Sequence, residues 1–498
     1  MTASRPSYEA SAAQFADWLP PMLVKELRQG LRTHMFVGAF VTLQLAMVSL
    51  LGFQLLAARD GGVTNLLTDL DQYLWIAIIA LLVVIMPLRG LMVISEETKG
   101  GTIDLVQLTH LSSVFIVLHK WLALISQTML LVIALLPYLV LRYFFGGEDV
   151  WFNVLALGWL TLISISLTAV CIAISSAGIV ARLLTLGVIG FPGYFMAAEF
   201  IENRDNFSSG GPPVLSLAYL LLAAMIIALT LASKHLSAPG ENGTTRFRVI
   251  AILVMSGAVI GCLVGGTDES IAWIMWMVPL MIVAGLESLS EQLKEHPGIY
   301  TPFVRRGLVG RLAGRVLYPG WTSGVGFVLM LGLMFSEAAC FCPVRHGTMD
   351  WAFRLGMSAF QFTMALVFPA AIMPLMPSFK HRHWLYVGIQ AVCVLITIGL
   401  MAAFDDGRNL TAAILHGLLP MPAMVRELLH GNGASYPWSE HLTTVACSNI
   451  VILALILFHG RHERRQIRAL EAQAKALLTV PSTTDAAIAT PLTPAPES

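Results

Sequence analysis

The sequence has very little charge for its length. Only 12% of its 498 residues are Asp, Glu, Lys or Arg, against about 25% in soluble globular domains. Thirty basic residues balance thirty acidic ones, and the lack of a basic excess argues against a nucleic-acid-binding protein. Six scattered cysteines are too few for a disulfide-stabilised scaffold, and a hydrophobic content of 56% excludes a disordered chain. With these classes of protein excluded, a polytopic membrane protein remains.

What the sequence does contain is a series of long apolar runs. A bilayer core of about 30 Å takes about 20 residues of helix, and the seventh and eighth runs fit this length least well. None of the runs alternates as a membrane strand does. We therefore predict an all-α, polytopic integral membrane protein with about 12 transmembrane helices. The runs are 36–58, 73–94, 121–145, 151–175, 183–200, 214–232, 249–266, 271–286, 321–340, 355–376, 385–404 and 442–459.

The distribution of Lys and Arg predicts the orientation of these spans. No signal peptide precedes the first run, so the polar leader 1–35 is expected in the cytosol. With twelve spans, 22 of the thirty Lys and Arg residues then fall in cytosolic segments, six in outside segments and two within span ends. A cytosolic excess of basic residues is the rule for membrane proteins. We predict that both termini are cytosolic and that the chain resides in the plasma (inner) membrane.

The chain is predicted to divide near residue 240. The Pro/Gly-rich segment 237–248 is interpreted as a cytosolic linker between two six-span units, 36–236 and 249–459. The last part, 460–498, is predicted to be cytosolic: a charged helix over 461–478, then a disordered tail rich in Pro, Thr, Ala and Ser. Arginines of that helix suit an anionic lipid surface, which makes membrane lipid an expected partner.

The segment between the second and third runs carries the most informative motif. Gly100 and Gly101 allow a tight turn or a close approach to a partner. Ile103, Leu105 and Leu108 give a short cytosolic helix its apolar faces. The same residues are also compatible with an ordinary connecting loop.

The order of residues in this segment resembles the cytosolic loop of ABC-2-type transporter permeases. The resemblance also includes the leader 23–32, which looks like the amphipathic interfacial helix of that family, and it covers the first half of the chain. His110 and His119 depart from the pattern, since Pro and Gly are usual there. The second six spans resemble no family, and are either a fused permease-like half or an unrelated accessory module. The matching loop positions are Glu97, Gly101, Thr102, Ile103, Asp104, Leu105, Leu108, Thr109, Leu111, Ser112 and Lys120.

The resemblance implies a function. Such permeases form the membrane path, and a separate ABC ATPase subunit docks on the loop; permeases of this family also pair as homo- or heterodimers. No phosphate-binding loop is present, since none of the seven lysines follows a glycine. The chain is therefore predicted not to be an enzyme and to carry no cofactor, with ATP and Mg²⁺ bound by the ATPase. The residues expected to couple to it are Glu96, Glu97, Gly100, Gly101, Thr102, Ile103, Asp104, Leu105 and Leu108. Those expected in the interfacial helix are Lys25, Glu26, Arg28 and Arg32.

Two other functions stay open from the residues alone. A secondary transporter driven by an ion gradient needs charged groups deep in several spans, and only Glu199 qualifies. A membrane-embedded enzyme needs clustered His, Asp and Glu residues or a nucleophile beside a base, and no such cluster is evident. The polar residues Gln44, Gln54, Gln127 and Gln361 either line a path or bond neighbouring helices.

A metal site is weighed and rejected. Cys340, Cys342 and His346 supply two thiols and an imidazole, which are ligands of copper or zinc. A span end with incidental cysteines is the simpler interpretation, and we predict no metal site.

Overall fold

The structure is a computed structural model that describes most of the chain. Within the described residues every regular element is a helix, and the chain forms two compact units, Met1–Ala238 and Pro239–Ser498, which are treated separately below. The described residues are 20–59, 64–94, 112–146, 150–175, 214–238, 240–265, 267–344, 349–376, 381–403, 415, 418–429 and 438–479.

Ten described helices are long and apolar enough to cross a membrane, or eleven if the bent pair Thr443–His459 and Arg461–Thr479 counts as one span. This confirms the predicted class, an all-helical multi-pass membrane protein. The predicted span 183–200 lies outside the described residues, so the total of twelve stays a prediction. The ten are His34–Leu56, Gln72–Ile94, Ser113–Leu141, Val150–Ser175, Leu215–His235, Gly243–Val264, Ala272–Leu289, Trp321–Phe341, Phe353–Leu375 and Arg382–Ala403.

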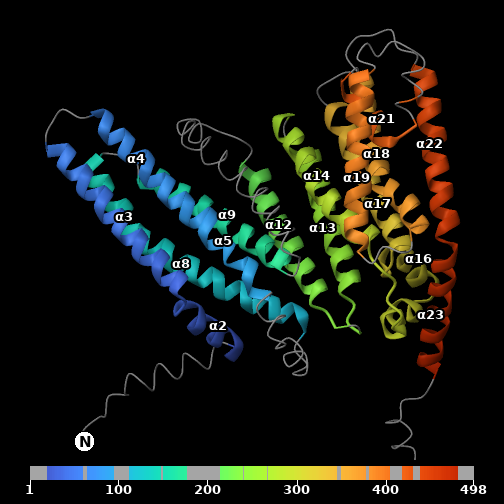
Figure 1. The fold of residues 1–498 in the computed structure, drawn as a ribbon, viewed down its shortest axis with the longest axis horizontal. Coiled ribbons are helices and arrows are strands. Elements are labelled where there is room, and N and C mark those ends of the chain that lie inside the picture. The colour runs from blue at the N-terminus through green and yellow to red at the C-terminus, as the bar shows by residue number, and fades with distance from the viewer. Residues whose placement is uncertain are drawn as a thin grey trace, which may run out of the picture. The chain divides into compact units, whose positions relative to one another are not determined.

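In the first unit the helices lie side by side (Figure 1). Their facing sides bury large apolar residues such as Met47, Leu74, Leu131 and Leu157, while residues such as Leu45 remain exposed, as expected for lipid-facing positions. The elements are α2 (Pro21–Leu31), α3 (His34–Arg59), α4 (Thr64–Ile79), the π-helix η1 (Ala80–Ile85), α5 (Met86–Leu88), α8 (Ser113–Gly146), α9 (Val150–Ser175) and α12 (Val214–His235).

The second unit combines span-length helices with shorter ones. The long helices α17 and α18 pack against each other, and α14 packs against α17. The elements are α13 (Gly243–Val264), α14 (Thr267–Leu289), the 3₁₀ turn η2 (Pro297–Ile299), α15 (Thr301–Arg305), α16 (Gly307–Leu317), α17 (Trp321–Val344), α18 (Met349–Ile372), the 3₁₀ turn η3 (Met373–Leu375), α19 (Arg382–Ala403), α21 (Pro420–Leu429), α22 (Trp438–His459) and α23 (Arg461–Thr479).

Helix α13 begins at Gly243, so the last six residues of the predicted linker 237–248 are helical. The side chain of Asn242 caps this helix by accepting a hydrogen bond from the backbone N–H of Thr245 at 3.1 Å. Two polar residues in the first turns of α13, Thr244 and Arg248, are buried. The division into two six-span units joined by a cytosolic linker stays a prediction.

The stretch 287–320, which contains four arginines, includes three short helical elements. η2, α15 and the connection after α16 pack against α23 around Tyr300, Phe303, Tyr318 and Leu470. The helix predicted over 461–478 is observed as α23, and it is bent by 48° from α22 at Gly460. We treat α22 as the span and α23 as lying outside the membrane, because α23 carries seven charged residues and begins with Arg461.

Candidate functional site

The structure has a helix, α2, where the sequence analysis predicts an interfacial helix, and a buried ion pair holds α2 to the rest of the first unit. Glu26 Oε1 accepts from Lys120 Nζ at 3.1 Å, and the Lys120 side chain is only 3% exposed. A charge-assisted bond shielded from water is stronger and better oriented than one on the surface. Glu26 and Lys120 both belong to the residues that carry the family resemblance, and the fold brings them together across 94 positions.

The C-terminal end of α2 is fixed by a second contact. Arg89 donates to the Gly30 carbonyl at 3.4 Å and to Thr33 Oγ1 at 3.2 Å, so a cation lies where the helix exposes its last carbonyls. Gly30 itself packs so closely on the side chain of Gln127 that a Cβ at this position would overlap it. The orientation of α2 against α8 is thus set at both of its ends.

The remaining predicted residues of α2 lie on its other face. Lys25, Arg28 and Arg32 are exposed and, together with Val24 and Gln29, line an open groove of about 510 Å³. Glu26 faces the membrane helices, whereas these three cations face outward. The helix therefore presents a basic surface on a rigidly held support.

All nine predicted coupling residues, from Glu96 to Leu108, lie outside the described residues, but the helix ends on both sides of them are described. The backbone N–H of Ile94 donates to Ser175 Oγ at 3.0 Å. Ile94 and Ile116 belong to one buried apolar cluster, and Met22 of α2 packs against that cluster. Helix α2 therefore packs against an apolar cluster that includes Ile94 and Ile116, which lie close to the two ends of the 95–111 segment.

The polar residues predicted within the spans are distributed rather than gathered. Gln44 accepts a hydrogen bond from the Tyr138 hydroxyl, which is a bond between neighbouring helices. Gln361 is 1% exposed, and neither of its amide atoms has a protein partner within the described residues. Asn153, which the sequence analysis did not single out, is also buried, and neither of its amide atoms has a partner within the described residues. The sequence signal that could have found it is a polar amide inside an apolar run. Gln54 and Gln127 are buried as well.

Two sets of predicted residues are described only in part. Glu199 and His346 lie outside the described residues, as does the side chain of Cys342; Cys340 is a free, partly buried thiol. Among the residues that the structure describes, no group of three or more His, Cys, Asp or Glu side chains is placed to hold a metal ion.

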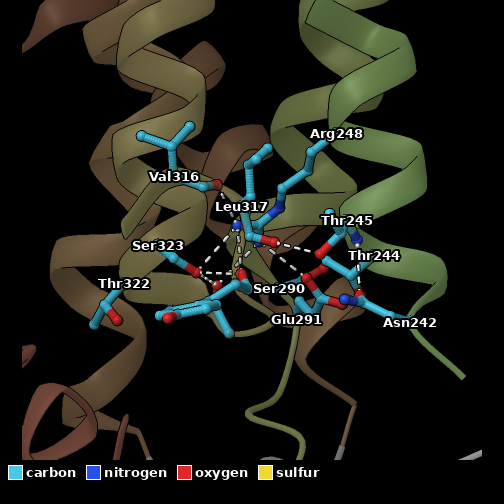
Figure 2. A network of polar contacts seen from close by, with 12 residues as sticks. Asn242, Thr244, Thr245, Arg248, Ser290, Glu291, Val316, Leu317, Thr322 and Ser323 are labelled. Carbon is cyan, nitrogen blue, oxygen red and sulfur yellow. Dashed lines mark hydrogen bonds and ion pairs between the residues drawn. The ribbon is translucent and has the colours of Figure 1, made fainter. Parts of the chain in front are cut away.

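The second unit contains a polar centre that the sequence analysis missed, built around Arg248 (Figure 2). The Arg248 side chain is fully buried, and its guanidinium lies between α13, the end of α14 and the start of α17. One terminal nitrogen donates to the Val316 and Tyr318 carbonyls at 2.8 and 2.7 Å and to Ser323 Oγ at 3.0 Å. The other donates to Glu291 Oε2 at 3.0 Å and to the Gly320 carbonyl at 3.1 Å.

We refer to this arrangement as the Arg248 junction, because it joins elements that are distant in sequence. Five oxygen atoms surround one guanidinium, and the Glu291 carboxylate also accepts a hydrogen bond from Thr244 of α13. Thr245 donates to the Leu317 carbonyl at 3.0 Å, which ties the same turn of α13 to the end of α16. A buried cation is tolerated only when it is paired and hydrogen-bonded in this way. The junction therefore fixes α13, α14, α16 and α17 relative to one another at this end of the unit.

The Arg248 junction extends to α23 through Glu463. This carboxylate is 7% exposed and accepts from the backbone N–H of Thr322 at 3.5 Å. Burial raises the pKa of Glu463 to about 7, although the Thr322 hydrogen bonds and the charges of Arg382 and Arg248 oppose the rise. Gly320, with φ of +118°, leaves room for the carboxylate, because a Cβ there would overlap it.

The raised pKa gives a pH dependence of stability. Below a pH of about 4.5 Glu463 is protonated in both states, whereas between about 4.5 and 7 only the folded chain keeps the proton, so folding stability falls as pH rises. We expect the melting temperature of the detergent-purified chain to fall from about pH 5 to 8, and Glu463→Gln to remove most of that slope.

The control for this prediction is Glu295→Gln, a change at an exposed carboxylate. His459 and His462, which line the same cavity as Glu463, are unchanged in both proteins, so any contribution from them cancels in the comparison. An equal slope in the parent and in Glu463→Gln would show that this carboxylate is not the responsible group.

Comparison with protein-family models, with curated proteins and with solved structures finds no match to this chain. The functional interpretation therefore depends on the residues and their geometry.

Proposed function

We propose that the chain is the membrane-spanning permease subunit of an ATP-driven transporter of the ABC-2 type. In this proposal the spans form the translocation path, and a separate ABC ATPase binds at α2 and the 95–111 segment. The resemblance in sequence supports the proposal at both places, and neither of them carries a nucleotide-binding motif.

One structural observation carries most of the argument. α2 packs on the helix ends that flank the 95–111 segment, held there by Glu26–Lys120 and by Arg89. A surface that transmits force from a soluble subunit to membrane helices has to be attached rigidly to them. The anchoring of α2 supplies that attachment, and its exposed Lys25, Arg28 and Arg32 supply charge for a partner surface.

The proposal includes the finer topology. Twelve spans place both termini, the 287–320 stretch and α23 in the cytosol, with the chain in the plasma membrane. The six-span units 36–236 and 249–459 then form either a complete path or one half of a permease dimer.

The test is purification of the tagged full chain from its native membranes in mild detergent. We expect it to elute with a second subunit that contains a phosphate-binding loop, in an equimolar complex that hydrolyses Mg²⁺-ATP. Replacing the phosphate-loop lysine of that subunit by alanine should abolish hydrolysis without dissociating the complex.

A chain that elutes alone and, after reconstitution, moves solute only under an ion gradient would instead establish the secondary transporter. Hydrolysis that survives the lysine substitution would come from a contaminant and would also contradict the proposal.

A further inference from the structure

The second unit has a strongly basic groove that the proposed function does not use. We refer to it as the arginine groove. It has a volume of about 750 Å³ and lies between α16, the first turn of α17 and the first turns of α23. Its lining includes Arg311, Arg315, Arg461, Arg464, Arg465 and Arg468.

Among the described residues that line this groove, six arginines face a single carboxylate. The one carboxylate in the lining, Glu471, accepts a hydrogen bond from the Tyr318 hydroxyl at 2.9 Å. Within the described part of the chain no carboxylate lies within ion-pair distance of Arg311, Arg315, Arg465 or Arg468. Several guanidinium groups in one groove repel one another, and an anion bound between them would relieve that repulsion.

The position of the groove indicates which anion. α22 ends at His459 and α17 begins at Trp321, so the first turns of α23 and α17 lie where two spans end. Thr322 and Ser323 of α17 contribute to the lining, so the groove reaches the level of the span ends. At this depth a bilayer presents its phosphate groups.

The buried and exposed sides of α16 also place the groove at the level of the lipid phosphates. Gly310 and Gly314 are buried, and a Cβ at either position would overlap Phe303 or Tyr318, so this side of the helix faces the protein. Leu308, Val309 and Leu312 are 76%, 75% and 51% exposed. At 100° per residue Leu308 and Leu312 lie opposite the glycines, with Val309 on one flank of the helix and Arg311 and Arg315 on the other.

Such an arrangement is that of a helix lying along a membrane surface, with apolar side chains in the lipid and cations at the phosphates. A groove for a soluble anion would not need the exposed Leu308, Val309 and Leu312 beside it. Arginine is also the side chain best suited to phosphate, because its planar fork donates two parallel hydrogen bonds.

We propose that the arginine groove binds the phosphate of an anionic phospholipid, with α16 inserted beside it in the bilayer interface. The proposal is independent of the ATPase-binding role of the first unit. It assigns one lipid site to the second unit, on the side where α13 begins and α22 ends.

The experiment measures lipid retention by the full chain. The protein is purified in detergent, incubated with phosphatidylglycerol or phosphatidylcholine, and examined by native mass spectrometry. We expect preferential retention of phosphatidylglycerol. Arg311→Gln/Arg315→Gln and Arg465→Gln/Arg468→Gln, which alter the two walls separately, should each weaken it about ten-fold or more.

The matched control is Arg305→Gln/Arg306→Gln. It removes two charges from exposed arginines of the same stretch, which do not line the groove. It should retain phosphatidylglycerol like the parent. An equal loss in the control and in the groove variants would show a diffuse basic surface and would overturn the proposal.

Two further measurements distinguish a lipid phosphate from free phosphate, and a loss of lipid binding from misfolding. Millimolar inorganic phosphate should not displace the lipid; full displacement would identify a free-anion site instead. Arg311→Lys/Arg315→Lys keeps the charge and should retain more lipid than the Gln pair. If every variant, including the Lys pair, retains lipid like the parent, the groove is not the site.

Discussion

Replacing Arg248 by methionine is expected to lower the stability of the second unit by about 3–5 kcal/mol, the usual cost of removing one partner of a buried ion pair. Methionine fills much of the arginine volume but donates no hydrogen bond, so Glu291 and the carbonyls of Val316, Tyr318 and Gly320 lose the same donor together. The measurement is the melting temperature of the detergent-purified chain, which should fall by about 10 °C.

Arg246→Met is the matched control, because Arg246 lies two positions earlier on α13 and its side chain is 39% exposed. It pairs with Glu241 on the surface, where such ion pairs contribute little, so its melting temperature should stay close to that of the parent. The double variant Arg248→Met/Glu291→Leu should recover part of the loss, because it removes the unpaired carboxylate as well. A parent-like melting temperature for Arg248→Met would mean that the junction does not hold this end of the unit together.

Leu105→Asp is expected to remove the ATPase from the purified complex, with at least a ten-fold loss of co-purified ATP hydrolysis. The proposal places Leu105 in an apolar contact with the ATPase, and a carboxylate buried there without a partner costs several kcal/mol. Membrane insertion and the melting temperature of the chain alone should not change, because residue 105 lies outside every predicted span.

Leu477→Asp provides the comparison. It makes the same substitution at a leucine that is 54% exposed near the end of α23. This variant should assemble and hydrolyse ATP like the parent. If Leu105→Asp does so too, the 95–111 segment is only a connector, and the proposed function loses its coupling surface.

Most of the spans could be predicted because a bilayer imposes one simple requirement, a run of about 20 apolar residues. The first run, predicted over 36–58, is observed as His34–Leu56, and the other runs that fall within the described residues agree to within a turn or two at most ends. The start of α13 could not be placed from the sequence, because its first turns contain polar residues. The partners of Thr244 and Arg248, at 291 and 316–323, cannot be inferred from local sequence.

The candidate sites divide in the same way. The helix around Lys25, Glu26 and Arg28 was predicted from the family resemblance, whereas the pairing of Glu26 with Lys120 depends on how α2 crosses α8. α16 was missed because its small glycine face and short length give no span-like signal. Its arginines were visible as charges, but the sequence did not show that they gather with those of α23.

The Arg248 junction has a consequence for how this region tolerates genetic variation. Three of the five oxygens that Arg248 binds are main-chain carbonyls, which every amino acid supplies. An alanine scan through 316–320 would therefore leave these acceptors in place, and any defect it reveals would report packing instead. The contact depends on the donor, which only Arg248 supplies, so substitutions at position 248 should be among the least tolerated in the second unit. At position 316, by contrast, side chains of a size similar to valine should be accepted.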